Sequence, residues 1–214
     1  MIPQTAGRSL DTRLAEMVAT RLCHDLCSPL STLNAIMPQA GEALAHDLLL
    51  ETVAALKARH QLFCAVFGTA DGFDWSRLAA LLDGAPTAHR VRFAVGVEPQ
   101  GAPPAASTLR LLLAALMLAA EALPRGGVVR LACTAEGGFA ITAEGQDAAW
   151  SSTLVLLLSG GSLDAALDYG PRRALAPWTL RLAAAECREV GFALGVEAAM
   201  PPLLISPPTV SSSN

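Results

Sequence analysis

A histidine and an aspartate stand side by side at His24 and Asp25, within the stretch RLCHDLCSPL at residues 21–30. A neutral imidazole nitrogen is a nucleophile, and a neighbouring carboxylate can orient the ring or take up its proton. Pro29 lacks the backbone N–H that would bond the carbonyl of Asp25, so it is expected to loosen the helix just after the histidine. The stretch therefore predicts an activated histidine beside a point of local freedom.

The helix that carries His24 is expected from about residue 11 to residue 37. At about 100° per residue, its apolar side chains fall on the side opposite His24. Polar side chains, including Arg21, Ser28 and Ser31, surround the histidine instead. His24 is therefore expected to point away from the core that this helix builds. The apolar positions are Ala15, Val18, Leu22, Leu26, Leu30, Leu33 and Met37.

A second helix is expected from about residue 42 to 67, after a break at residues 38–41 and before Gly68. Two long amphipathic helices cannot close a core alone, whereas two copies of a helical hairpin can pair into a four-helix bundle. The sequence therefore predicts an N-terminal hairpin domain at residues 9–68 that forms a homodimer.

A linker is expected at residues 69–74, and the pattern changes beyond it. Residues 75–206 mix short strands with helices, which predicts a separate two-layer α/β sandwich and an α+β fold overall. Ser107 is the expected N-cap of a strongly apolar helix that we expect to be buried. The expected strands are 91–97, 128–134, 139–143, 192–196 and 203–205, and the expected helices are 75–82, 107–123 and 176–190.

Composition excludes several classes of function. The 214 residues carry a net charge of −4 without a stripe of Lys and Arg, which argues against a nucleic-acid partner. The most apolar run, residues 111–120, is too short to span a bilayer, so no membrane association is expected. Five cysteines without a CxxC pair argue against a disulfide framework. A reduced, cytoplasmic protein is the expectation.

A zinc site is an alternative role for part of the hairpin. Cys23 and Cys27 lie one helical turn apart, as do His60 and Cys64, and facing helices could bring the four together. The spacing is not that of a usual zinc knuckle, and free cysteines are more often small buried hydrophobes. No metal site is therefore predicted.

The stretch RLCHDLCSPL resembles the phosphoacceptor box of sensor histidine kinases, where a histidine, an acidic residue and a Ser/Thr-Pro pair follow in this order. Together with LLLAALMLAAEALPRGG at residues 111–127, it more closely resembles the ChpT-type bacterial histidine phosphotransferases. The resemblance extends from about residue 14 to residue 196. It implies a hairpin that dimerises into a bundle, and a second domain like a kinase ATP-binding domain that has lost its nucleotide site.

The resemblance also implies the roles of particular residues. His24 and Asp25 are the implied catalytic residues of a phosphoryl relay, and receivers are implied to dock on the bundle surface near Arg21, Ser28 and Ser31. The partners are the receiver domain of a hybrid histidine kinase and one or more response regulators. No cofactor of the chain's own is implied, because the receiver supplies Mg²⁺.

A true kinase is disfavoured by the residues of the second domain. A kinase needs an Asn-bearing helix and a Gly-rich turn to reach the phosphates and the metal. The chain has only Asn34 and Asn214, and the sequence DYG at residues 168–170 is followed by Pro171 and Arg172 instead of a second glycine. Two hypotheses remain, namely a histidine phosphotransferase acting without ATP, which we favour, and a non-catalytic dimeric adaptor that binds receivers.

Overall fold

The structure is a computed structural model that describes residues 9–68, 74–96, 98–99, 103–193 and 200–208. Residues 69–73 of the expected linker lie outside the described residues, as do the last three residues of the strand expected at 192–196. No helix in the described ranges combines the length and the apolar character needed to cross a membrane.

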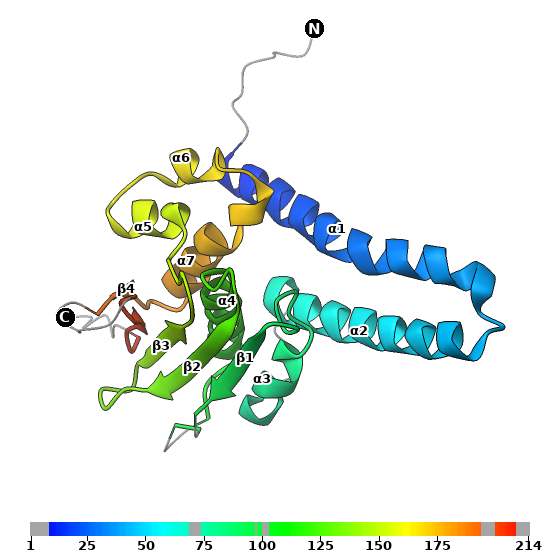
Figure 1. Cartoon of the computed structure of the whole chain (residues 1–214). Helices are drawn as coiled ribbons and strands as arrows, with labels where there is room; N and C mark the ends of the chain where they lie inside the picture. Colours follow the sequence, from blue (N-terminus) through cyan, green and yellow to red (C-terminus); the bar gives the residue numbers. More distant parts are fainter. Residues whose placement is uncertain (1–8, 69–73, 97, 100–102, 194–199, 209–214) are drawn as a thin grey trace, which may run out of the picture.

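The N-terminal part is a helical hairpin, as predicted. Helix α1 spans Leu10–Ile36, the short 3₁₀ helix η1 spans Met37–Gln39, and helix α2 spans Ala43–Phe67. The Ser9 side chain accepts the backbone N–H of Thr12 and so caps the start of α1. The tip of the hairpin projects far from the globular part of the molecule (Figure 1).

Helix α1 continues through Pro29 instead of loosening there, which differs from the expectation for that residue. The carbonyl of Asp25, which Pro29 cannot bond, accepts a hydrogen bond from Nη1 of Arg59 on α2, at 3.0 Å. A donor from the neighbouring helix thus replaces the missing backbone N–H.

The C-terminal part is a sheet with helices against one face. Strand order is β1-β2-β3-β5-β4, with β1 parallel to β2 and the other pairs antiparallel. Its elements are α3 (Trp75–Leu82), β1 (Val91–Val95), α4 (Ala106–Glu121), β2 (Gly127–Cys133), β3 (Phe139–Glu144), α5 (Ser152–Leu158), α6 (Leu163–Leu167), η2 (Pro171–Arg173), α7 (Leu175–Ala185), β4 (Val190–Phe192) and β5 (Leu203–Ile205).

Helix α4 is the centre of the globular core. All residues from Leu111 to Ala120 are buried, as expected for this apolar helix, because the sheet, α7 and the end of α2 cover it. Along β2 and β3, buried Val129, Leu131 and Ile141 alternate with more exposed residues such as Arg130, so one sheet face packs and the other meets water. The result is the α+β class predicted from the sequence.

Several boundaries differ by one or more residues from the sequence-based expectation, among them those of α4, α7 and β4. Helix α4 begins at Ala106 after Ala105, so Ser107 is not its N-cap and no side chain caps it. Helix α7 ends at Ala185 instead of residue 190, because Cys187 adopts a left-handed φ of 53° that a helix cannot continue through. The following strand, β4, consequently begins earlier, at Val190.

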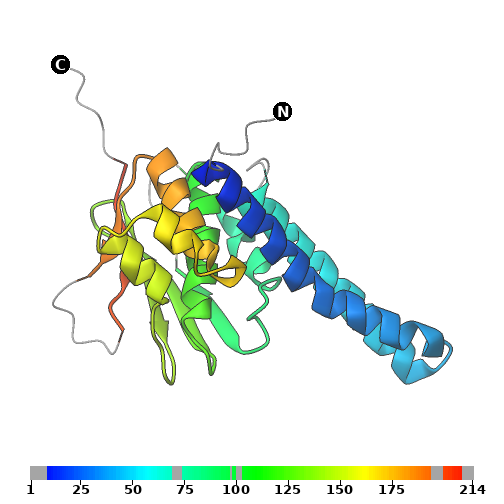
Figure 2. The ribbon, with the colours of Figure 1, turned by 90° about the horizontal axis from the view of Figure 1, so that it is seen from above.

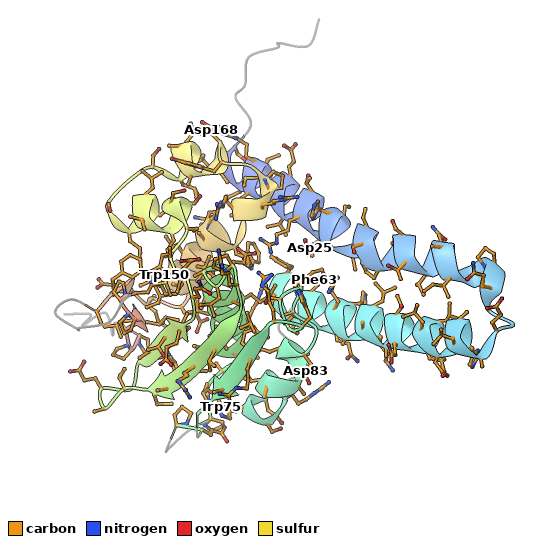
Figure 3. The ribbon with its side chains drawn as sticks, in the orientation of Figure 1. Asp25, Phe63, Trp75, Asp83, Trp150 and Asp168 are labelled. Carbon is orange, nitrogen blue, oxygen red and sulfur yellow. The ribbon has the colours of Figure 1, made fainter. Side chains whose placement is uncertain are left out.

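The first turns of α1 pack on the globular part (Figure 2). Leu14, Met17 and Val18 form a small buried cluster with Leu167 of α6 and with Ala174. Arg13 pairs with Asp164 and, at 2.7 Å, with Asp168, which Figure 3 shows beside the start of α1. Helix α1 is therefore held by α6 at one end and by α2 at the other.

Candidate functional site

His24 lies in a cleft of about 870 Å³ between α1 and the globular part. Its side chain is 57% exposed, so the imidazole is accessible from solvent. Thr20 and Asp25 line the cleft on the α1 side, while Arg90 and Arg172 line it from the globular part. The sequence placed His24 on an open bundle surface, but the structure places it where two parts of the chain meet.

The two ring nitrogens of His24 have different neighbours. Nδ1 is 3.2 Å from Oδ1 of Asp25, and Nε2 is 3.3 Å from Nη2 of Arg172. A carboxylate can only accept, so the Asp25 contact favours the tautomer with the proton on Nδ1. In that tautomer Nε2 carries the lone pair and accepts a hydrogen bond from Nη2 of Arg172, so Arg172 must move aside before Nε2 can act as a nucleophile.

Arg172 reaches His24 because of the turn between α6 and α7. Gly170 has a φ of 87°, a left-handed conformation that side chains disfavour, and it leads into η2. The carbonyl of Arg172 accepts a 3.0 Å hydrogen bond from Nη1 of Arg21, which fixes the η2 backbone against α1. The contact between Arg172 and His24 thus depends on the bend at Gly170 and on the hydrogen bond from Arg21 to the Arg172 carbonyl.

Arg21 is buried, which differs from the exposed position near the receiver-docking surface that was expected for it. Its side chain is only 8% exposed, because α4 and η2 cover this side of α1. The guanidinium pairs with Glu121 at the end of α4 and, at 3.3 Å, with Asp25. Arg21 therefore ties α1 to the globular part and holds the carboxylate that contacts His24.

The charges of this cluster are strongly coupled. Burial alone would lower the pKa of Arg21, but Glu121 and then Asp25 outweigh it and raise that pKa, so the guanidinium remains charged. Burial raises the pKa of Glu121, and the negative charge of Asp25 adds to this, while Arg21 opposes it. Arg21 is thus the cation that allows two carboxylates to lie close together at the base of the cleft.

Replacing Arg21 by Met is expected to lower the free energy of unfolding by about 2 kcal/mol at neutral pH. Removing one partner from a buried pair usually costs more, but Glu121 is partly open to solvent, which screens its charge. The loss should shrink as pH falls, because protonated Glu121 needs no cation, and the raised pKa of Glu121 starts this change above the usual carboxyl range. Urea unfolding at several pH values measures it.

The matched variant for this measurement is Glu121→Gln, which leaves the Arg21–Asp25 pair intact. It is expected to cost less than about 1 kcal/mol at neutral pH, because one cation still faces one carboxylate. Equal losses in the two variants at all pH values would contradict the role of Arg21 as the shared cation.

Comparisons with known proteins identify the family of the chain and a protein of similar fold. Residues 77–199 match the family model of the histidine phosphotransferase C-terminal domain. The chain belongs to the histidine phosphotransferase family. The fold is similar to that of a solved bacterial phosphotransferase, with a TM-score of 0.72 and 22% identity, covering 94% of this chain and 98% of that one. Comparison with curated proteins gave no match. The resemblance to ChpT-type phosphotransferases is thereby confirmed.

The site of this histidine phosphotransferase includes residues that sequence reasoning missed. Arg172, Arg173, Arg90 and Glu121 all line the His24 cleft, yet none was predicted as a site residue. Each lies far from His24 in sequence, by 148 residues for Arg172. The available signal was the pair of arginines after DYGP at residues 168–171, where a kinase would need glycine.

The remaining predicted site residues lie farther along α1. Ser28 and Ser31 are both exposed, on the polar side of the helix. All five cysteines are exposed, which differs from the buried hydrophobes expected of them. Cys64 Sγ lies 3.6 Å from Nε2 of His60, but within the described ranges no three His, Cys, Asp or Glu side chains gather as metal ligands.

Proposed function

We propose that this histidine phosphotransferase relays a phosphoryl group between receiver-domain aspartates through His24, without ATP. The observation that carries the proposal is the pair of contacts at the imidazole, with Asp25 at Nδ1 and Arg172 at Nε2. One contact leaves the lone pair on Nε2, and the other holds a cation that can move from Nε2 onto the oxygens of an incoming phosphoryl group.

In the proposed first step, Nε2 of His24 attacks the phosphorus of an aspartyl phosphate on a receiver. The N–P bond forms while the P–O bond to the receiver carboxyl breaks, and the electron pair leaves with the aspartate carboxylate. The proton on Nδ1 stays on the ring, and Asp25 stabilises the positive charge that the ring gains. Transfer to a second receiver is the reverse of this step.

Positive charge in the cleft supports this chemistry. Arg172, Arg173 and Arg90 line it together, and guanidinium groups match the oxygens of a phosphoryl group in geometry and charge. Charge on those oxygens dominates phosphoryl transfer, so positioned cations are the main contribution a protein can make. In this proposal the receiver supplies Mg²⁺ and the rest of the neutralisation.

The proposed partners are a hybrid histidine kinase receiver and one or more response regulators, in the cytoplasm. Docking is proposed on the side of the hairpin that carries the cleft, near Ser28 and Ser31. Leu48, Ala55 and Leu62 share one side of α2 at seven-residue spacing. Leu62 is buried near the globular part, while Leu48 and Ala55 are exposed toward the tip, so they offer apolar contact along the hairpin.

The direct test is a transfer assay with a receiver that carries labelled aspartyl phosphate. The proposal expects acid-labile label on this protein and its passage to a second, unlabelled receiver. The adaptor hypothesis instead expects binding without label, and a true kinase expects labelling by ATP alone. Either of those results would replace the relay.

A homodimer is the proposed assembly, because one flank of the hairpin exposes apolar side chains. Cys23 and Leu30 of α1 and Met37 at the start of η1 recur at seven-residue spacing and are all exposed, about a third of a turn from His24. Val53 on α2 is exposed as well and lies well away from Leu48 around that helix. Two such flanks can bury each other in a four-helix bundle.

Val53→Glu is therefore expected to weaken the dimer at least about a hundredfold, since a charge in an apolar interface is left uncompensated. Leu48→Glu is the matched control, because Leu48 is 44% exposed and Val53 is 48% exposed, on different sides of α2. Light scattering over a dilution series should show a monomer only for Val53→Glu. A monomeric unmodified chain, or the opposite pattern between the variants, contradicts this assembly.

A further inference from the structure

The backbone carbonyl of Asp25 accepts a hydrogen bond from a side chain of another helix, which is unusual inside an α-helix. In an α-helix the N–H of residue 29 would donate to the carbonyl of residue 25, but Pro29 has none. A proline inside a helix usually produces a kink with an unsatisfied carbonyl. Here Nη1 of Arg59 donates to that carbonyl at 3.0 Å, across from α2.

Arg59 is poorly placed to do anything else. Its Nε is buried and has no hydrogen-bond partner among the described residues, a costly state for part of a guanidinium. The Arg59 side chain does donate a hydrogen bond through Nη1, to the Asp25 carbonyl. An arginine held in this way, at the position opposite the proline, indicates a specific role for that contact.

The backbone of Arg59 is itself held by the globular part. Gly84, in the turn after α3, approaches α2 so closely that a Cβ there would lie 2.2 Å from the Ala58 carbonyl oxygen and 2.9 Å from the Arg59 nitrogen. This part of α2 therefore cannot move away from the α3 turn without losing tight packing. Arg59 connects that fixed point to the main chain of the residue next to His24.

We propose that Arg59 is a positioning residue for the phosphoacceptor. It replaces the helix donor that Pro29 lacks, and so fixes the direction of α1 at the point where its first half, clamped by Arg21, meets the hairpin. His24 and Asp25 lie just before that point, and Arg172 approaches from another element. A displacement of about 1 Å in such an arrangement costs about a hundredfold in rate.

The test compares the effect of Arg59→Met in chains with and without Pro29. The measurement of the transfer rate rests on the proposed relay. Arg59→Met is expected to slow phosphorylation of His24 about tenfold at saturating phosphorylated receiver. The receiver concentration at half-saturation should change much less than the rate, because the Arg59 side chain bonds the main chain of α1. In the Pro29→Ala background, where the substituted residue supplies the missing N–H, the same Arg59→Met change should cost less than about twofold. Arg59→Lys, which keeps one charged donor, should recover most of the rate.

An unfolding measurement separates this inference from the relay itself. The urea midpoint should fall in Arg59→Met but fall much less in Pro29→Ala/Arg59→Met, whether or not the protein accepts phosphate. Absence of transfer in the unmodified protein would therefore remove the relay while leaving this coupling to be measured. Additive effects of the two substitutions on the midpoint would overturn the inference, as would failure of both Arg59→Met proteins to fold. Folding of the double variant alone would support it.

Discussion

Replacing His24 by glutamine is expected to abolish transfer from a phosphorylated receiver, with a loss of at least about a thousandfold. Glutamine is polar and close in size, so it keeps the shape of the cleft, but its amide nitrogen is not a nucleophile. The imidazole is the side chain whose Nε2 meets Arg172, so its loss removes the proposed acceptor. The measurement is single-turnover loss of label from the receiver.

Two controls make the His24 result specific. His46→Gln, which changes an exposed histidine on the hairpin, should leave the rate unchanged. Binding of the receiver to His24→Gln should also persist, since the docking side chains are intact. Acid-labile label on His24→Gln would show that another residue accepts the phosphoryl group, and the relay through His24 would be wrong.

Replacing Arg172 by alanine has the next largest expected effect, a loss of about 10²- to 10³-fold in the rate of His24 phosphorylation. This is the size found when one positioned donor to a developing oxyanion is removed. The Nη2 atom of Arg172 stands 3.3 Å from Nε2, so its guanidinium is the nearest described cation to the transferred group. Arg172→Lys should recover only part of the rate, because lysine lacks the bidentate fork.

Arg92→Ala is the matched control for Arg172, since Arg92 is an exposed arginine of the same domain that does not line the His24 cleft. It removes the same charge from the chain without touching the site. If both variants lose rate equally, the effect is long-range attraction of the receiver, which rising salt would suppress. A rate within about twofold of the unmodified protein for Arg172→Ala would exclude a role in transfer.

Periodicity was sufficient to predict the hairpin and the exposure of His24. The apolar repeat places half-buried Leu22, Leu26 and Leu33 on the side of α1 opposite His24, but Ala15, Leu30 and Met37 of the same predicted stripe are exposed. Helix α4 was equally clear, because an all-apolar helix must be buried. The β2–β3 pair followed from two short runs separated by Glu136, Gly137 and Gly138.

The site was only half predictable. Spacing gives the angle of a side chain on its own helix but not what covers that angle, so Arg21 was assigned to a surface although α4 and η2 bury it. The contact between Arg172 and His24 joins segments 148 residues apart, and no local sequence pattern predicts such a contact. Ser107 was a reasonable cap by propensity, but the helix begins one residue earlier, after Ala105.

Helix α1 belongs to the hairpin but packs on the globular part, so the two parts cannot be separated without exposing it. Cutting after Gly68 would release a hairpin whose Leu14, Met17 and Val18 face water and whose histidine has lost its arginine. The isolated hairpin should therefore be prone to aggregate and a poor acceptor, even with RLCHDLCSPL intact. The globular half is then indispensable to the proposed relay, because it supplies Arg172 to the cleft that holds His24.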